Sequence, residues 1–485
     1  MNKEARLKYC YAPREIKMLQ VDVKVRPTLD PDFVPAVLWN RSYRKKVKAS
    51  REAVPIAICL KRNNGAISRL DFEILPHTTK NRKLNIKYIE RMLKYMLWMY
   101  GGQKITIAGN AEIAVIIANL YSADGKRYFD NDLVGRKVYG KDLEFISCEY
   151  NEAPQAAEFT VPLGRNLNGA RVGFDLGGSD RKAATVVDGK VVFSEEIEWD
   201  PYFKEDWQYH LNGIKNTLNR AIAKIPAGRK LDAIGGSAAG VYVDNLVRTA
   251  SLFRGVIKAN GGKLPEEVVN MFELLRKEYN VPFITVNDGE ITALAGSMSL
   301  EVNSLLGIAM GTSVAGGYVN HSGNITDWLN ELAFVPCDYR ENAPIDEWSK
   351  DEGCCAQYFS QQGVARLVPL AGIKLPSDIS LPQQLTEVQK LMASGDKRAR
   401  KIYETIGVYF GYTIALFAEF YEIKNLLILG RVTSGDGGNL ILRVAQDVLI
   451  KESPNLAKEI RFTVPDEKNK RHGQAVAAAS LPAIL

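Results

Sequence analysis

The spacing of apolar residues predicts alternating strands and helices over residues 54–150. Short apolar runs bounded by turn residues indicate strands, and apolar residues three and four positions apart indicate helices. The expected elements are strands over Val54–Leu60 and Ala66–Leu75 joined by a turn at Asn63-Asn64-Gly65, a helix over Ile86–Tyr100, a strand over Lys104–Ala108 and a helix over Ala111–Tyr121. Their order predicts an N-terminal α/β domain, to which the sequence assigns no role.

The segments on either side of this domain lack a sustained period. Residues 1–53 contain four prolines between positions 13 and 35, and we expect them to form an extended basic arm. Residues 151–168 are rich in glutamate, alanine, proline and asparagine, and we expect them to form a linker.

From residue 169 the pattern predicts two further α/β lobes, at 169–303 and 304–485. In the first lobe the expected strands are Arg171–Leu176, Ala183–Val187, Lys190–Trp199, Leu231–Gly236 and Val281–Val286, and the expected helices are Trp207–Lys224 and Pro265–Tyr279. The second lobe is expected to begin with two strands, to continue with helices around Cys354–Leu367, Leu385–Met392 and Arg398–Tyr421, and to end in a helix placed to return to the first lobe.

Composition places the chain among ordinary globular proteins. Its 485 residues exceed the size of one core, and 46% of them are hydrophobic and 25% charged. No window approaches 18 consecutive apolar residues and the first residues lack the apolar centre of a signal peptide, so a cytoplasmic location without a membrane partner is expected. The six cysteines are scattered or adjacent, which favours free thiols.

The net charge of +7 is uneven, because residues 1–165 carry +11 and the rest carry −4. The excess peaks over Arg41–Arg51, where six basic residues are interrupted by no acid. Such a run fits nucleic acid or another anionic partner, but a solvated face is the commoner explanation for a single charge run.

Three glycine-rich segments, each after an apolar run, carry the candidate chemistry. They are Asp175-Leu176-Gly177-Gly178-Ser179, the segment from Gly311-Thr312 to Gly317, and the segment from Gly430 to Gly438. Glycine turns offer backbone N–H groups to phosphate. Between the first two, Asn287-Asp288 ends an apolar strand, where an acid is placed to act as a base.

This ordered set resembles the actin-like ATPase superfamily and, within it, the ROK family of sugar kinases and sugar-responsive repressors. The resemblance covers about residues 169–485. It implies a two-lobed actin-like (ribonuclease H-like) fold, with the N-terminal α/β domain as an addition in front. It also implies that Leu427–Ser434 is the adenosine segment and that Gln474–Ala479 lies in the closing small-residue helix.

The resemblance implies specific roles. Asp288 would be the general base, although the cap of a helix is its ordinary alternative. Asp288, Asn287 and Glu331 would bind the substrate. Asp175 would hold Mg²⁺ through water. The groups that would bind the phosphates and nucleoside of ATP are Gly177, Gly178, Ser179, Gly311, Thr312 and Gly430, together with Asp175.

Four features depart from the family. Phe334 replaces a histidine that orients sugar and binds zinc, and Ala356 replaces a sugar-binding glutamate. Of the zinc loop only Cys337 and Cys354 are represented, so no structural zinc is expected. Asp180 places a negative charge where a basic or amide residue is usual.

These observations favour an ATP- and Mg²⁺-dependent kinase of a sugar or sugar-like hydroxyl compound. The alternatives are a non-catalytic ROK-type regulator and a degenerate kinase fold that binds a protein or ligand. The strand-rich pattern after residue 54 does not predict a helix-turn-helix, so sequence-specific DNA binding is not expected. A homodimer, as in many relatives, is left open.

Overall fold

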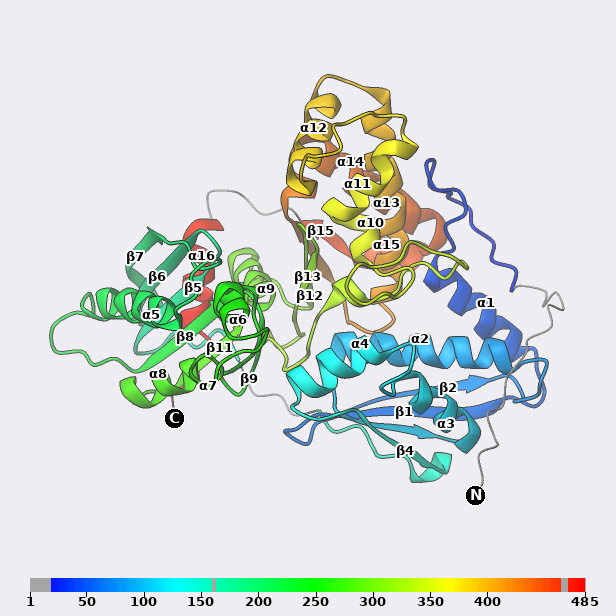
Figure 1. The fold of residues 1–485 in the computed structure, drawn as a ribbon, viewed down its shortest axis with the longest axis horizontal. Coiled ribbons are helices and arrows are strands. Elements are labelled where there is room, and N and C mark those ends of the chain that lie inside the picture. Colours follow the sequence, from blue (N-terminus) through cyan, green and yellow to red (C-terminus); the bar gives the residue numbers. More distant parts are fainter. Residues whose placement is uncertain (1–18, 159–162, 464–469, 485) are drawn as a thin grey trace.

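The computed structural model describes residues 19–158, 163–463 and 470–484. The first 18 residues of the expected arm and residues 159–162 of the expected linker therefore lie outside it. The described residues form four sheets, one in the N-terminal domain, one in each lobe and a small two-stranded one. Figure 1 shows the first lobe in green, the second in yellow to orange, and the N-terminal domain in blue to cyan beneath the second lobe.

The N-terminal domain is an α/β structure, as the apolar pattern predicts. Its sheet has the strand order β2-β1-β3-β4, and the expected hairpin pairs Val54 with Ile74 and Lys61 with Ile67. The strands are β1 (Val54–Lys61), β2 (Ile67–Ile74), β3 (Lys104–Ala108) and β4 (Glu144–Cys148). The helical segments are α2 (Arg82–Tyr100), α3 (Ala111–Leu120), α4 (Tyr128–Asp130), a π-helix (Asn131–Val138) and a 3₁₀ turn (Tyr150–Glu152). Strand β4 was not expected.

The expectation of an extended arm over residues 1–53 is wrong for helix α1 (Ala36–Lys48). Trp39, Tyr43 and Val47 recur every four residues and are buried, which is the helical spacing. The prolines that suggested an extended chain all precede the helix, and Pro35 stands at its start, a position that tolerates proline. Helix α1 packs against α2 and against a long helix of the second lobe.

The first lobe has a five-stranded sheet with the order β11-β8-β5-β6-β7, in which β5 is parallel to β8 and antiparallel to β6. The strands are β5 (Ala170–Leu176), β6 (Asp180–Val187), β7 (Lys190–Glu198), β8 (Ala233–Ala238) and β11 (Phe283–Asn287), with the separate hairpin β9 (Val241–Val243) and β10 (Leu246–Thr249). The helices are α5 (Trp207–Ile222), α6 (Arg254–Ala259), α7 (Glu266–Val269), α8 (Met271–Tyr279) and α9 (Asp288–Leu300), with a 3₁₀ turn at Ser251–Phe253.

One helix of this lobe differs from the expectation. The single helix predicted over Pro265–Tyr279 is broken at Asn270 into α7 and α8. The Asn270 side chain donates to the Glu266 carbonyl at 3.0 Å, and such side-chain bonds compete with regular helix hydrogen bonds.

The second lobe has a four-stranded sheet with the order β13-β12-β14-β15. The strands are β12 (Leu305–Met310), β13 (Val314–Val319), β14 (Asn425–Leu429) and β15 (Arg461–Thr463). The helices are α10 (Ala356–Phe359), α11 (Gln361–Leu370), α12 (Leu381–Ala393), α13 (Lys397–Phe417), α14 (Gly435–Glu452), α15 (Pro454–Glu459) and α16 (Lys470–Ala479), with 3₁₀ turns at Leu332–Phe334 and Arg431–Thr433. Helix α16 packs on β5, β6 and β8 of the first lobe (Figure 1).

The expected helix over Cys354–Leu367 is also broken, at Ser360. Its backbone is extended, and its hydroxyl accepts a hydrogen bond from the Gln362 N–H at 3.0 Å. Ser360 is therefore the N-cap of a new helix, α11, instead of an interior residue of one helix.

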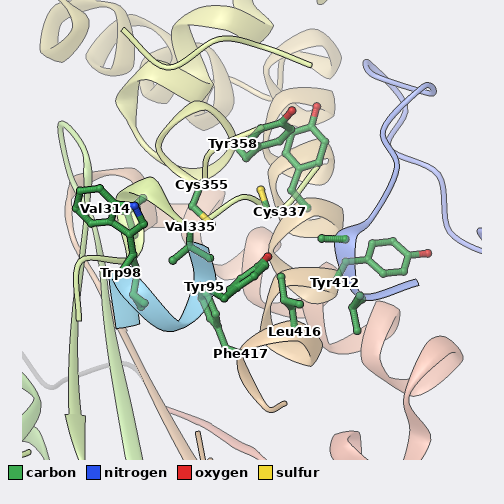
Figure 2. Packing of buried hydrophobic residues seen from close by; sticks show 14 of the residues in the cluster. Tyr95, Trp98, Val314, Val335, Cys337, Cys355, Tyr358, Tyr412, Leu416 and Phe417 are labelled. Carbon is green, nitrogen blue, oxygen red and sulfur yellow. The ribbon is translucent and has the colours of Figure 1, made fainter. Parts of the chain in front are cut away.

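The N-terminal domain and the second lobe share one hydrophobic core. Figure 2 shows Tyr95 and Trp98 of α2 beside Val314 of β13, Val335, and Leu416 and Phe417 of α13. All of these side chains are almost fully buried. The two parts are thus packed together through a continuous apolar interface. Among the helices that the structure describes, none is long and apolar enough to span a bilayer.

Candidate active site

Asp175 is the penultimate residue of β5, at the centre of the first-lobe sheet. It is 4% exposed, and burial raises its pKa even though Lys182 and Ser237 act in the opposite direction. The hairpin register places Lys182 directly opposite Asp175 on β6. The Lys182 ammonium lies 3.5 Å from the Asp175 carboxylate and 2.8 Å from that of Asp180. The carboxylate expected to face a metal ion therefore already has a cation beside it.

The glycine turn that follows β5 is closed by its own backbone. The Gly177 N–H donates to the Asp180 carbonyl at 2.8 Å, and the Ser179 hydroxyl donates to the Asp180 carboxylate at 2.9 Å. Gly178 has no room for a side chain, because an added Cβ would lie 2.2 Å from the Tyr202 hydroxyl oxygen. The expected phosphate turn is formed, and the side chains of Asp180 and Tyr202 lie against it.

Asn287 and Asp288 lie where β11 meets α9. The side-chain amide oxygen of Asn287 (Oδ1) caps α9 by accepting from the Gly289 N–H at 2.7 Å, and its amide nitrogen (Nδ2) donates to the Gly240 carbonyl at 2.6 Å. The helix cap is therefore Asn287, and Asp288 is the first helical residue. This frees the Asp288 carboxyl from the capping role that its position alone suggested.

The Asp288 carboxyl is half-buried, and its surroundings make it a weaker acid than usual. Burial, followed by the charge of Asp175, raises its pKa to about 6. Glu331 is also half-buried, and burial followed by the charge of Asp288 raises its pKa to about 7. Three carboxyl groups, from β5, α9 and the segment before the 3₁₀ turn Leu332–Phe334, are thus electrostatic neighbours. A base poised near neutral pH is the kind that proton abstraction from a hydroxyl requires.

The N-terminal domain positions the segment that carries Glu331. The backbone N–H groups of Asn330 and Glu331 donate to the carbonyls of Met99 and Trp98, both at 2.9 Å, in the last turn of α2. The Asn330 side chain accepts from the Tyr421 hydroxyl at 2.8 Å and lies 3.5 Å from Glu290. The added domain therefore supports one wall of the candidate site.

The other expected nucleotide contacts lie in the second lobe. Gly311 and Thr312 form the turn between β12 and β13, where the Gly311 N–H donates to the Ser313 carbonyl at 2.9 Å and Thr312 is exposed. Gly430 has φ +105°, and an added Cβ would lie 2.4 Å from the Met310 carbonyl oxygen, so only glycine fits there. Between the described residues, no hydrogen bond or ion pair joins this turn to Asp175 or Asp288.

Phe334 and Ala356, which depart from the family pattern, pack against apolar and aromatic side chains. The Phe334 ring lies 4.4 Å from that of Trp98 and 5.2 Å from that of Phe129, measured between centroids. Ala356 is buried in the same cluster. Cys337 and Cys355 are enclosed by apolar and aromatic side chains (Figure 2), and burial raises the pKa of both thiols. In the part of the chain that the structure covers, no three histidine, cysteine or acidic side chains are grouped to hold a metal ion.

The donor set at the first turn can be tested against the nucleotide and metal that the resemblance implies. A turn that already receives the Asp180 carboxylate suits a phosphate, which is also an anion. A magnesium ion at Asp175 does not fit the arrangement, because the Lys182 ammonium occupies the cation position beside that carboxylate. The assignment of Asp175 as a magnesium ligand stays a prediction, and the Lys182–Asp175 contact weighs against it.

Sequence reasoning missed two side chains at this turn. Lys182 precedes the predicted strand over Ala183–Val187 by one residue, whereas β6 begins at Asp180 and pairs Lys182 with Asp175. Had the predicted strand begun three residues earlier, at Asp180, the hairpin register would have paired Lys182 with Asp175. Tyr202 lies in the loop after β7, and nothing in the local sequence indicates that it covers Gly178.

No protein-family model matches the sequence, and a comparison with curated proteins finds no significant match. Solved structures do match. A ROK hexokinase from Thermus thermophilus aligns with 64% of this chain and 97% of its own, with a TM-score of 0.50 and 16% identity. The fold is that of the ROK proteins. A ROK family transcriptional regulator, a homolog of the E. coli MLC protein, aligns with 68% of this chain and 82% of its own at the same TM-score and identity. The two-lobed fold is thus shared by a kinase and a regulator.

Proposed function

We propose that this protein transfers a phosphoryl group from ATP to a hydroxyl of a sugar or sugar-like compound. The observation that carries the proposal is the Asp288 carboxyl, which is free of the helix cap and has a pKa raised to about 6. At neutral pH such a group is ionised and still basic enough to accept a proton from an attacking hydroxyl. The charge of Asp175, which precedes the glycine turn, acts on this carboxyl, and a phosphate is expected at that turn.

Glu331 is the second acidic group proposed to contact the substrate. Its pKa, raised to about 7, leaves it able to donate or accept a hydrogen bond near neutral pH. Asn287 contributes differently, since both ends of its amide are engaged with the backbone. We assign it the role of fixing the start of α9, and therefore of Asp288.

ATP would supply the transferable phosphoryl group. Its phosphates would be held by Gly177, Gly178 and Ser179 from the first lobe and by Gly311 and Thr312 from the second, and Gly430 would let the backbone approach the nucleoside. Excluding water from the reacting groups would then require the lobes to close on the ligand. Magnesium has no step assigned to it here, because Lys182 lies against Asp175.

A regulator or degenerate kinase is the second candidate. The replacement of a histidine and a glutamate by Phe334 and Ala356 favours it, because Ala356 is buried in an apolar cluster, Phe334 packs against that cluster, and neither side chain offers a hydrogen bond to a sugar. A site that has lost such groups loses discrimination between hydroxyl compounds.

The test is a comparison of ATP binding and turnover in the parent and the Asp288→Asn variant, after a screen of hexoses, amino sugars and polyols. The variant should bind ATP nearly as the parent does, while turnover falls by about 10² to 10⁴, the usual contribution of a positioned base. Asp188→Asn is the matched control, because Asp188 is exposed and its carboxylate, among the residues that the structure describes, contacts Arg229 and the Gly169 N–H at the surface, away from Asp288. Full turnover in Asp288→Asn, or no ATP binding at several millimolar, would refute the proposal.

A further inference from the structure

The first glycine turn holds a charged cluster that the proposed reaction does not use. Lys182 is half-buried and pairs with the two carboxylates of Asp175 and Asp180 at 3.5 and 2.8 Å. Asp175 is held by its strand and is almost fully buried. Asp180 stands at the end of the turn and is more exposed, with 21% of its side chain accessible. Lys182 therefore has one fixed partner and one partner near the solvent.

The Asp180 carboxylate contacts two side chains of the turn that could otherwise contact a phosphate, whereas the Gly177 N–H donates to the Asp180 backbone carbonyl. One of its oxygens accepts from the Ser179 hydroxyl at 2.9 Å, and the other pairs with Lys182. An added Cβ on Gly177 would lie 3.1 Å from the Asp180 carbonyl oxygen and 3.5 Å from its carboxylate, so Asp180 lies against this glycine. Although burial acts in the opposite direction, Lys182 and Ser179 hold the pKa of Asp180 below its usual value, which keeps it charged.

Tyr202 and Arg254 close the other side of the turn. The Tyr202 hydroxyl covers Gly178, and the Arg254 guanidinium lies 3.8 Å from the centroid of the Tyr202 ring. Ser179 is the exposed residue of the turn, and Asp180 beside it is partly exposed. Lys182 also keeps 15% of its side chain accessible, so a ligand phosphate at the turn could contact it in place of Asp180.

We propose that Lys182 binds the terminal phosphate of ATP, and that Asp180 is an internal competitor that occupies Lys182 until the ligand displaces it. The identity of the ligand rests on the proposed function. The exchange replaces one ammonium–carboxylate contact by one ammonium–phosphate contact, and phosphate carries the greater charge. Since Lys182 brings a positive charge to the point where a metal ion would meet Asp175, ATP binding should depend only weakly on divalent cations.

The experiment is titration calorimetry of ATP, first with EDTA and then with Mg²⁺, on the full chain and three variants. Asp180→Asn removes the competing charge and keeps the size of the side chain, so ATP should bind about tenfold more tightly, a change of about 1.4 kcal/mol. Lys182→Met should weaken binding by about tenfold or more, and Lys182→Arg should restore part of it. Lys190→Met, an exposed lysine on neighbouring β7, is the matched control and should bind as the parent does.

The double variant Asp180→Asn with Lys182→Met gives the sharpest result. If the two side chains compete as proposed, Asp180→Asn should no longer tighten binding once Lys182 is absent. Unchanged affinity in Asp180→Asn, or parent-like affinity in Lys182→Met, would overturn this inference and leave the proposed function standing. If the variants change ATP affinity as expected but the parent phosphorylates no hydroxyl compound in the screen, the inference would be supported and the proposed function refuted. ATP binding by neither the parent nor Asp180→Asn would refute both.

Discussion

The ring of Phe334 packs against that of Trp98, tilted by 38° with 4.4 Å between centroids, so a residue of the second lobe completes a cluster of the N-terminal domain. Phe334 lies three residues after Glu331, and the backbone N–H groups of Asn330 and Glu331 donate to carbonyls of α2. The position at which the ROK resemblance expects a sugar- and zinc-binding histidine is thus used to join two parts of the chain. The N-terminal domain takes part in shaping the site.

The first prediction is that purified protein contains less than one zinc per chain. Phe334 supplies no ligand atom, and the Cys337, Cys354 and Cys355 thiols are buried and protonated, with raised pKa values. Elemental analysis after mild chelation checks this. Stoichiometric zinc that resists the chelator would mean that these cysteines bind metal in an arrangement unlike the one described here.

The second prediction concerns the pH dependence of turnover. Burial and the charge of Asp175 raise the pKa of Asp288 to about 6, and a general base must be deprotonated to act. The value of kcat/KM should therefore be level above about pH 7 and fall by about tenfold for each pH unit below about 6. The profile is measured in buffers of constant ionic strength. An acidic limb near pH 4 would show that Asp288 is not the group that titrates.

The third prediction is that Asp288→Asn stabilises the protein at pH 7. A carboxyl whose pKa is raised from 3.8 to about 6 binds its proton more tightly in the folded state. The ionised group therefore lowers stability above pH 6, whereas below about pH 4 it is protonated in both states and has no such effect. The variant should gain about 1–3 kcal/mol at pH 7 and little at pH 4. Thermal unfolding of both proteins at the two pH values measures this. Equal gains at the two values would contradict the explanation.

The fourth prediction concerns the buried charges that join α2 to the second lobe. Lys94 is fully buried and pairs with Asp130 at 3.0 Å and with Asp351 at 3.1 Å. Lys94→Met would leave these carboxylates with less compensation, and breaking a buried pair costs about 3–5 kcal/mol. Lys83→Met is the control, because Lys83 and its partner Glu341 are both 63% exposed, and its effect should stay below about 1 kcal/mol. Equal thermal shifts in the two variants would contradict this.

The sequence predicted most strands of both lobes because apolar runs and turn residues are local signals. It predicted Asp175 and the glycine turn for the same reason. Lys182 escaped because its role depends on the register between β5 and β6, which one strand does not reveal. The contact of Tyr202 with Gly178 depends on the path of a loop through space. The apolar spacing of α1 is helical, but the run of basic residues and the prolines before it led to the prediction of an extended arm.

The last prediction concerns nucleic acid. Of the six basic residues expected to project from an arm, Arg41 donates to the Glu452 carbonyl and Arg44 pairs with Glu419, so both hold α1 against the second lobe. The four that remain exposed are Lys45, Lys46, Lys48 and Arg51. Any DNA binding through this face should be weak and independent of sequence, because it would consist of phosphate contacts alone.

Fluorescence anisotropy with two unrelated duplexes checks this prediction. Binding should be equal for both and fall by roughly tenfold or more between low and physiological salt, because each neutralised phosphate releases counterions. The double variant Lys45→Glu and Lys46→Glu should weaken it further, whereas Lys190→Glu, on the first-lobe sheet, should leave it unchanged. A complex that prefers one duplex and persists at physiological salt would contradict the prediction. It would also make the regulator the better explanation of the fold, since a ROK regulator and a ROK hexokinase match this chain equally well.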